Sequence, residues 1–251
     1  MTVTGIVVQA RIGSHRLPGK VLLPLRGRTV LAHVIERCLA IEGAAVVCCA
    51  VPEGSADDPV AEEAARCGAR VFRGSETDVL DRYYRAARAF DMDPVMRVTS
   101  DCPLIDPAVC ADVLRLRAAT GADYACNNSP PTWPHGLDCE VVTFHWLERS
   151  AREATRAWER EHVTPYVRRH PDARRVNLPM PGSGAATHRW TLDNERDYRF
   201  LTNLCARLPR GPAAWDWGLP LAIAGSDPAL LAINAGQDRY EGLKTSMASS
   251  G

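Results

Sequence analysis

The sequence predicts an α/β fold built on a parallel sheet. Over residues 3–119, apolar runs too short for helices alternate with segments of helical periodicity. This alternation is typical of βαβ units, whose strands run parallel. The 251 residues suffice for one such domain with a large buried core. No window approaches about 18 uninterrupted apolar residues, so a membrane-spanning helix is not expected.

The first half of the chain supplies four strand–helix pairs. The apolar runs at 3–9, 46–51, 70–73 and 95–99 are predicted as strands, because each is too short for a helix. Helices are predicted over 31–39, 57–67, 78–90 and 107–119. The first of these has apolar residues at helical spacing, and the second carries Pro59 near its start, where a missing N–H costs little.

The pattern changes after Tyr124. Residues 127–136 are too rich in Pro, Asn and Gly for regular structure, and 179–184 form a second such loop. The remaining segments are predicted as strands at 137–143 and 188–192, helical stretches at 144–155 and 158–170, and a helix beginning at Asn194. The small polar residues 245–251 are expected to fray.

Composition excludes several classes of protein. Thirty basic residues balance thirty acidic ones, which argues against a nucleic-acid or membrane-surface partner. The first residues lack the cationic and apolar regions of a signal peptide. Nine scattered cysteines contain no C-x-x-C pair, so we expect reduced core thiols rather than zinc ligands or disulfides. A cytoplasmic location is therefore expected.

The segment that leaves the first predicted strand carries a concentrated positive charge. Residues 9–20 contain Arg11, Arg16 and Lys20 with two glycines and no carboxylate. Ligands of open α/β sheets bind at the carboxyl ends of the strands, and glycines let backbone N–H groups approach an anion. A phosphate-rich ligand explains this composition, and a solvated basic loop is the alternative. The spacing matches neither a P-loop nor a dinucleotide-binding motif.

At this point the sequence resembles a known family, the cytidylyltransferases that act on acidic sugars, such as CMP-Kdo and CMP-sialic acid synthetases. The resemblance is closer still to the branch of the spore coat polysaccharide biosynthesis protein SpsF, and it covers roughly residues 3–208. Its blocks are Q-A-R-x-G-S-x-R-L-P-G-K at 9–20, F-R-G-S-E-x-D-V-L-D-R-Y-Y at 72–84, R-V-T-x-D-C-P-L-I-D-P at 97–107, G-L-D-x-E-V at 136–141, E-H-V-T-P-Y at 161–166 and H-R-W-T-L-D at 188–193. The chain departs from the family at Ser100, where a glycine is usual, and in residues 50–52 and 130–135.

The resemblance implies a fold and a reaction. The fold is Rossmann-like, with a mixed, mostly parallel sheet of the nucleotide-diphospho-sugar transferase (glycosyltransferase A) type and a small inserted subdomain. One domain spans 1–240, with a nucleotide-binding half at 1–126, an acceptor and dimerisation insertion at 127–186 and a return to the core at 187–240. A flexible tail follows at 241–251. The reaction is transfer of CMP from CTP to an anionic acceptor with release of pyrophosphate, by a homodimer that uses Mg²⁺ or Mn²⁺.

Roles for individual residues follow from this resemblance and from their chemistry. Charge neutralisation at the phosphates is expected from Arg11, Arg16 and Lys20. Nucleotide contacts are expected from Gln9, Ala10, Gly13, Ser14, Arg73, Gly74, Ser75 and Ser100. Asp101 and Asp193 are the candidate metal ligands, since each follows a strand-like run; the alternative is that each caps the following helix. Residues 73–75 could equally be an ordinary turn before a helix.

Recognition of the acceptor is expected from the second half of the chain. Asp138 and Glu140 alternate on one predicted strand, so both side chains can point into a cleft, although a half-exposed strand would show the same pattern. His162 and Arg189 are further acceptor-binding candidates. An acidic sugar, a sugar phosphate or a phosphonate-type acceptor would fit.

Two alternative functions keep the same fold. A glycosyltransferase that uses a nucleotide sugar would commonly carry an Asp-x-Asp motif after a core strand. The only such letters near that region, at 91–93, precede their predicted strand. The other alternative is a non-catalytic nucleotide-binding partner of a biosynthetic enzyme, against which the intact basic loop and Asp101 argue.

Overall fold

The computed structural model describes residues 2–14, 16–182, 184–209 and 215–249 and contains a seven-stranded sheet. The strands are β1 (Val3–Gln9), β4 (Val46–Pro52), β5 (Arg70–Gly74), β6 (Met92–Thr99), β7 (Tyr124–Cys126), β8 (Glu140–Val142) and β9 (Arg175–Asn177). Their order is β5-β4-β1-β6-β8-β7-β9, and only β8 runs antiparallel to its neighbours. The predicted mixed, mostly parallel sheet is confirmed.

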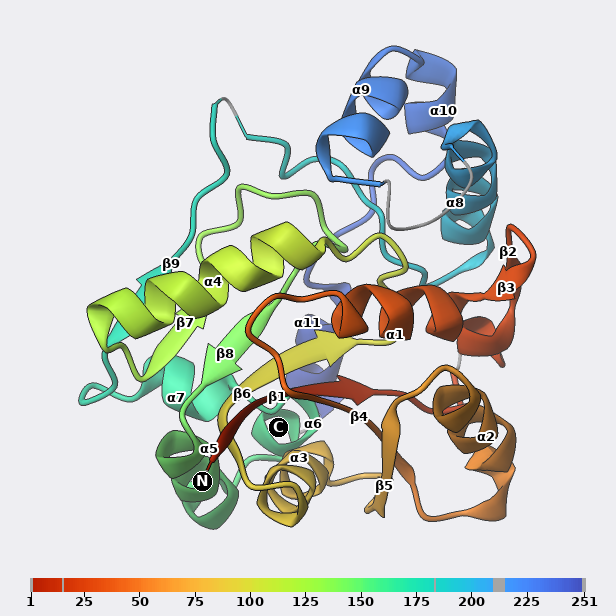
Figure 1. Cartoon of the computed structure of the whole chain (residues 1–251). Helices are drawn as coiled ribbons and strands as arrows, with labels where there is room; N and C mark the ends of the chain where they lie inside the picture. Colours follow the sequence, from red (N-terminus) through yellow and green to blue (C-terminus); the bar gives the residue numbers. More distant parts are fainter. Residues whose placement is uncertain (1, 15, 183, 210–214, 250–251) are drawn as a thin grey trace.

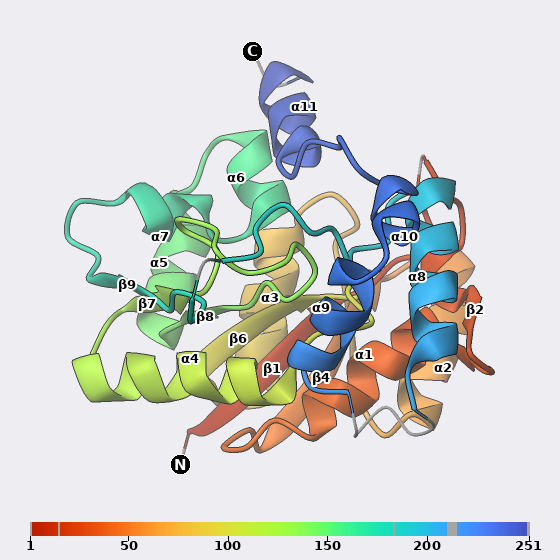
Figure 2. The same ribbon diagram turned by 90° about the horizontal axis from the view of Figure 1, so that it is seen from above.

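Helices cover both faces of the sheet (Figures 1 and 2). One face carries α1 (Val30–Leu39), α2 (Asp58–Arg66) and α4 (Pro107–Thr120), and the other carries α3 (Val79–Ala89), α5 (Phe144–Glu153), α6 (Ala157–His162) and α7 (Pro165–Arg169). Short elements connect these layers: the 3₁₀ turns η1 (Lys20–Leu22) and η2 (Ser55–Asp57), and the hairpin β2 (Pro24–Leu25) and β3 (Arg28–Thr29).

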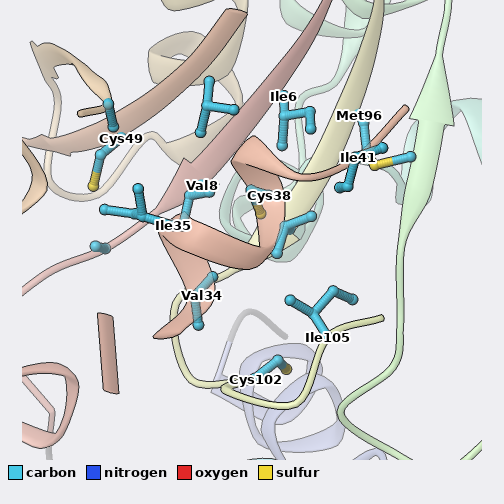
Figure 3. Packing of buried hydrophobic residues seen from close by; sticks show 14 of the residues in the cluster. Ile6, Val8, Val34, Ile35, Cys38, Ile41, Cys49, Met96, Cys102 and Ile105 are labelled. Carbon is cyan, nitrogen blue, oxygen red and sulfur yellow. The ribbon is translucent and has the colours of Figure 1, made fainter. Parts of the chain in front are cut away.

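Side chains that alternate along the central strand fill two separate cores. Ile6 and Val8 of β1 pack with Val34 and Ile35 of α1, as Figure 3 shows. Val7, between them, faces the opposite core with α3 and α5. All these residues are completely buried, so the central strand is covered on both faces.

The described C-terminal residues, 184–209 and 215–249, contain four more helices. These are α8 (Glu195–Arg207), α9 (Gly218–Gly225), α10 (Pro228–Ala232) and α11 (Glu241–Ser249). The first three pack around a third apolar cluster that contains Trp133, Trp190 and Trp215. The last helix returns to lie against α6 (Figure 2). The tail predicted from residue 241 is therefore helical through residue 249, and the last two residues fall outside the described part.

The predicted elements of residues 3–119 are confirmed, and the differences lie in the second half. Among the described residues, 188–192 form no strand, and their only β-pairing there is a bridge between His135 and Arg189. The apolar residues of this run, Trp190 and Leu192, pack in the third apolar cluster instead of on a face of the sheet. The stretch predicted as one helix over 158–170 is broken at Val163, which has a positive φ of 70°.

The structure shows the state of the cysteine side chains. All nine are free thiols, and eight of them are buried. In the described ranges, no helix combines the length and the apolar character needed to cross a membrane.

Candidate active site

A cleft of about 780 Å³ lies at the carboxyl ends of β1 and β6. Its floor consists of Gln9 and Ala10 at the end of β1 and of residues 99–101 at the end of β6. The basic loop, the start of α3, the end of α6 and the helix α11 form its walls. These segments are far apart in sequence, and Figure 2 shows α6 and α11 side by side above the sheet.

The ammonium of Lys20 joins two carboxylates in this cleft. Its Nζ atom lies 2.8 Å from Asp101 Oδ2 and 2.9 Å from Asp193 Oδ1, and it also donates to the carbonyl of Leu192 at 2.8 Å. Gly19, with a φ of 68°, provides the turn that brings Lys20 to this position. One backbone carbonyl and two carboxylates thus provide three hydrogen-bond acceptors for the ammonium.

The three charges stabilise one another. Burial disfavours the charged lysine, but Asp101 and Asp193 outweigh this effect and raise the pKa of Lys20. Burial likewise opposes ionisation of Asp101, but the Lys20 ammonium outweighs it and holds the pKa of this carboxyl well below its usual range. Lys20 and Asp101 are therefore both ionised at neutral pH.

The same two carboxylates fit the divalent cation that the resemblance implies. Asp101 Oδ2 and Asp193 Oδ1 already converge on a single positive atom. Mg²⁺ commonly takes one or two protein carboxylates and completes its shell with phosphate oxygens and water. No group of three or more His, Cys, Asp or Glu suited to a metal occurs within the described ranges, so Asp101 and Asp193 stay the candidate metal ligands.

The rest of the basic loop also lines the cleft. Arg16 forms ion pairs with Asp193, at 3.1 Å, and with Glu241 of α11. Arg11 has neither a hydrogen bond nor an ion pair to any residue that the structure describes. Gly13 and Ser14 line the cleft beside it, and an added Cβ at Gly13 would meet nothing within 4 Å. The loop therefore presents backbone and cationic groups to the same space.

Sequence reasoning missed a further cationic residue, Arg82 of α3. Its side chain lines the cleft, although only 2% of the residue is exposed. It donates to the carbonyl of Ser75, and its buried Nε atom has no partner within the described part of the chain. Burial and the positive charge of Arg11 lower its pKa. An arginine on an amphipathic helix normally lies at the surface, so the sequence offered no signal for this burial.

Three of the predicted nucleotide-binding residues lie beside the cleft rather than on its lining. Arg73 pairs with Asp58 at 2.5 Å. The hydroxyl of Ser75 accepts from the backbone N–H of Asp78, which in turn caps α3. Gly74 is buried against Arg82. These contacts are those of a strand-to-helix turn, and the nucleotide role of residues 73–75 stays a prediction.

His162 is the acceptor candidate that faces the cleft. Its Nε2 atom is buried without a hydrogen-bond partner in the part of the chain described. Burial and the nearby Arg97 lower its pKa, so the ring is neutral at pH 7. The next residue, Val163, has φ 70° and ψ −57°, and Thr164 N–H donates to the His162 carbonyl at 2.8 Å. This tight, strained turn directly follows the residue whose ring lines the cleft.

The other three acceptor candidates do not line the cleft, and each pairs with another side chain. Glu140 is the first residue of β8 and pairs with Arg97 at 2.6 Å, so Asp138 precedes the strand instead of sharing its face. Asp138 pairs with Arg239. Arg189 pairs with Asp193. Their acceptor roles stay predictions.

The buried Glu140 carboxylate also accepts hydrogen bonds from Tyr124 and Thr164. Although burial opposes its ionisation, Arg97 outweighs this and lowers the pKa of Glu140. The ion pair therefore joins two strands and the segment that follows His162.

Comparisons with known proteins agree with this geometry. A family model described as cytidylyltransferase matches residues 5–210. The spore coat polysaccharide biosynthesis protein SpsF of Bacillus subtilis is 32% identical over 82% of this chain and 88% of its own. A cytidylyltransferase structure from Leptospira borgpetersenii has a TM-score of 0.88 at 28% identity and covers 95% of this chain and 100% of its own.

A more distant structure supports the fold alone. The CMP:2-keto-3-deoxy-manno-octonic acid synthetase solved with CTP has a TM-score of 0.63 at 18% identity, over 82% of this chain and 99% of its own. The predicted nucleotide-diphospho-sugar transferase type of fold is thus confirmed.

Proposed function

The chain belongs to the cytidylyltransferase family and is a CTP-dependent nucleotidyltransferase, and on this premise we propose that it transfers CMP to an acidic sugar, a sugar phosphate or a phosphonate. The product would enter the synthesis of a cell-surface polysaccharide or a natural product. The observation that carries the proposal is the cluster of Lys20, Asp101 and Asp193 beside the loop that holds Arg11 and Arg16.

The reaction requires little covalent chemistry from the protein. An acceptor oxygen forms a bond to the α-phosphorus of CTP, the bond from that phosphorus to the bridging oxygen breaks, and pyrophosphate leaves. The hydroxyl of an acidic sugar releases its proton to solvent or to a neighbouring base, whereas an ionised phosphate or phosphonate oxygen has no proton to release. The main difficulty is to hold two anions in line while charge develops on the leaving oxygens.

The residues of the cleft can meet this requirement. Arg11, Arg16 and Lys20 would neutralise the triphosphate, with Gln9, Ala10, Gly13, Ser14 and Ser100 around the nucleotide. Asp101 and Asp193 would hold Mg²⁺ or Mn²⁺, which when bound neutralises phosphate charge and activates the α-phosphorus. We assign the buried Arg82 to the same phosphate-binding set, because its charge faces the cleft without a carboxylate partner among the described residues.

The neutral His162 is our candidate for contact with the acceptor. His162 lines the same cleft as the basic loop, and its buried, unpartnered Nε2 atom can donate to, or accept from, an acceptor hydroxyl. The reduced cysteines and the need for CTP favour the cytoplasm as the location of the protein. A homodimer through residues 127–186 is supported by β9, an edge strand within that range.

The motif considered for a glycosyltransferase lies at the wrong end of the sheet. Residues 91–93 flank the start of β6, whereas the cleft lies at the carboxyl end of that strand. Asp93 accepts from the backbone N–H of Phe144 at 3.0 Å and does not line the cleft.

The test is release of pyrophosphate from CTP over a panel of acidic sugars, sugar phosphates and phosphonates. Omission of each acceptor and replacement of CTP by ATP, GTP or UTP are the controls. We expect acceptor-dependent pyrophosphate with CTP and its loss in EDTA. Pyrophosphate release that is independent of every acceptor, or that prefers another nucleotide, would contradict the proposal.

A further inference from the structure

The two oxygens of the Asp193 carboxylate have different partners. Oδ1 faces the cleft and pairs with Lys20 and Arg16. Oδ2 points away from them and accepts from Arg189 Nη2 at 2.6 Å. Arg189 is only 8% exposed, so this second contact lies behind the cleft wall. One oxygen thus faces the cationic side chains of the cleft, while Arg189 holds the other from behind.

A second carboxylate, that of Asp197, holds Arg189 in place. Arg189 Nε donates to Asp197 Oδ1 at 2.9 Å and Nη2 donates to Oδ2 at 3.0 Å, which is the two-pronged geometry that fixes a guanidinium most firmly. Asp197 Oδ2 also accepts from the backbone N–H of Asp193 at 3.0 Å. The same carboxylate therefore restrains both the main chain and, through Arg189, the side chain of Asp193.

Residues near the end of the chain complete this arrangement. Asn234 donates to Asp197 Oδ1 at 3.1 Å and to the Arg189 carbonyl at 2.9 Å. Gln237 donates to Asp197 Oδ1 at 3.1 Å. Asp197 is completely buried, and both amides lie beyond the residues that match the family model.

Stability alone is a poor reason for this buried network. Replacing a buried ion pair by apolar residues is often neutral or stabilising. Nor is Asp197 needed as the cap of α8, because Asn194 already accepts from the first backbone N–H groups of that helix. What the network does fix is the direction of the Asp193 carboxylate.

We infer that Asp197, acting through Arg189, is a positioning residue that turns Asp193 Oδ1 towards the metal and the phosphates. The inference rests on the proposed role of Asp193 as a metal ligand. Groups that orient a metal-binding side chain commonly change metal affinity by about ten- to a hundredfold when they are replaced. Arg189 would then support the metal ligand, in place of the contact with the acceptor expected from the sequence.

The experiment measures Mn²⁺ binding to the intact protein without nucleotide, from the loss of the free-ion signal in electron paramagnetic resonance. Asp197→Asn keeps the size of the side chain but removes its charge, and we expect it to weaken Mn²⁺ binding about ten- to a hundredfold. Arg189→Lys keeps the charge but loses the two-pronged contact, and Asn234→Ala removes one support. Both should fall between Asp197→Asn and the wild type.

Asp106→Asn is the matched control. Asp106 is equally buried and caps α4 by accepting from Ala108 and Val109, with no contact to the Asp193 network. Its replacement should lower the melting temperature and leave Mn²⁺ affinity unchanged. Melting curves of every variant establish that the measured protein is folded.

Three results would overturn the inference. They are wild-type Mn²⁺ affinity in a folded Asp197→Asn variant, equal weakening in the Asp106→Asn control, and a rise in acceptor KM of Arg189→Lys with Mn²⁺ affinity intact. Pyrophosphate release by the wild type is measured in parallel. If it persists while the variants bind Mn²⁺ normally, the proposed function stands and only the positioning role falls.

Discussion

Replacement of Lys20 by methionine should destabilise the protein, and a divalent cation should reverse the loss. The ammonium lies 2.8 and 2.9 Å from Asp101 and Asp193, and all three side chains are 15–22% exposed. Without it, two carboxylates face each other with no shared cation. Removing one partner of a buried ion pair costs about 3–5 kcal/mol, and the partial exposure here favours the lower end, about 3 kcal/mol.

A loss of about 3 kcal/mol corresponds to a fall of about 6–12 °C in melting temperature for a chain of this size. The assay is thermal unfolding followed by far-ultraviolet circular dichroism, first in EDTA and then with Mn²⁺. Mn²⁺ should raise the melting temperature of Lys20→Met more than that of the wild type, because it supplies the missing charge. CTP turnover of the variant should fall in every condition.

The only other lysine of the chain provides a matched control. Lys244 pairs with Asp238 at the surface and is 66% exposed on its side chain, so Lys244→Met should cost about 1 kcal/mol or less. Two results would contradict this reasoning: melting of the Lys20 variant within two degrees of the wild type in EDTA, or an equal loss of stability in both variants. Either would show that the loss of the cation shared by Asp101 and Asp193 does not destabilise the protein.

The pH dependence of the same variant follows from the direction of the pKa shifts. The pKa of Asp101 is lowered in the folded protein. The contribution of its carboxylate to folding stability is therefore complete above about pH 4 and is lost as the pH falls through the lowered pKa. The pKa of Lys20 is raised in the folded protein. The contribution of its ammonium to folding stability therefore persists up to about pH 10 and is lost at higher pH. The difference in melting temperature between variant and wild type should be constant from pH 5 to 9 and shrink at more acidic pH.

Three further substitutions test other parts of the structure. Glu140→Gln leaves the guanidinium of Arg97, whose side chain is 17% exposed, without its carboxylate partner and should cost about 3 kcal/mol in urea unfolding, so a loss under 1 kcal/mol would refute the ion pair. Gly136→Ala places a Cβ 2.6 Å from a backbone carbon at a φ of 116° and should cost about 2–4 kcal/mol, whereas Gly54→Ala meets nothing within 4 Å and should be nearly neutral. Glu241→Gln frees Arg16 from an exposed ion pair and should lower the KM for CTP by about two- to fivefold; an increase would show that α11 assists binding.

The strand–helix alternation of the first half could be predicted because each element there has a long apolar pattern of its own. The strands β7 and β9 have three residues each, which is too few to show a period. The run at 188–192 has the composition of a strand, yet its apolar side chains pack against the helices that follow it. Local composition cannot distinguish apolar side chains that lie on a sheet face from those that pack against neighbouring helices.

The cleft could be predicted in part. Sequence order places the basic loop and Asp101 after parallel strands, and the structure brings them to one sheet edge. The burial of Arg82 and Arg189 could not be predicted, because each stands alone among polar or aromatic neighbours. Asp197 and Asn234 meet only through the return of the chain, and such long-range contacts leave no local signal.

The return of the C-terminal segment has a practical consequence for protein engineering. A truncation at residue 210, where the match to the family model ends, would preserve every strand and the basic loop. It would also remove the amides that support Asp197 and the helix that walls one side of the cleft. A chimaera that keeps residues up to 209 and takes its last helices from a relative would therefore exchange part of the cleft while leaving the sheet untouched.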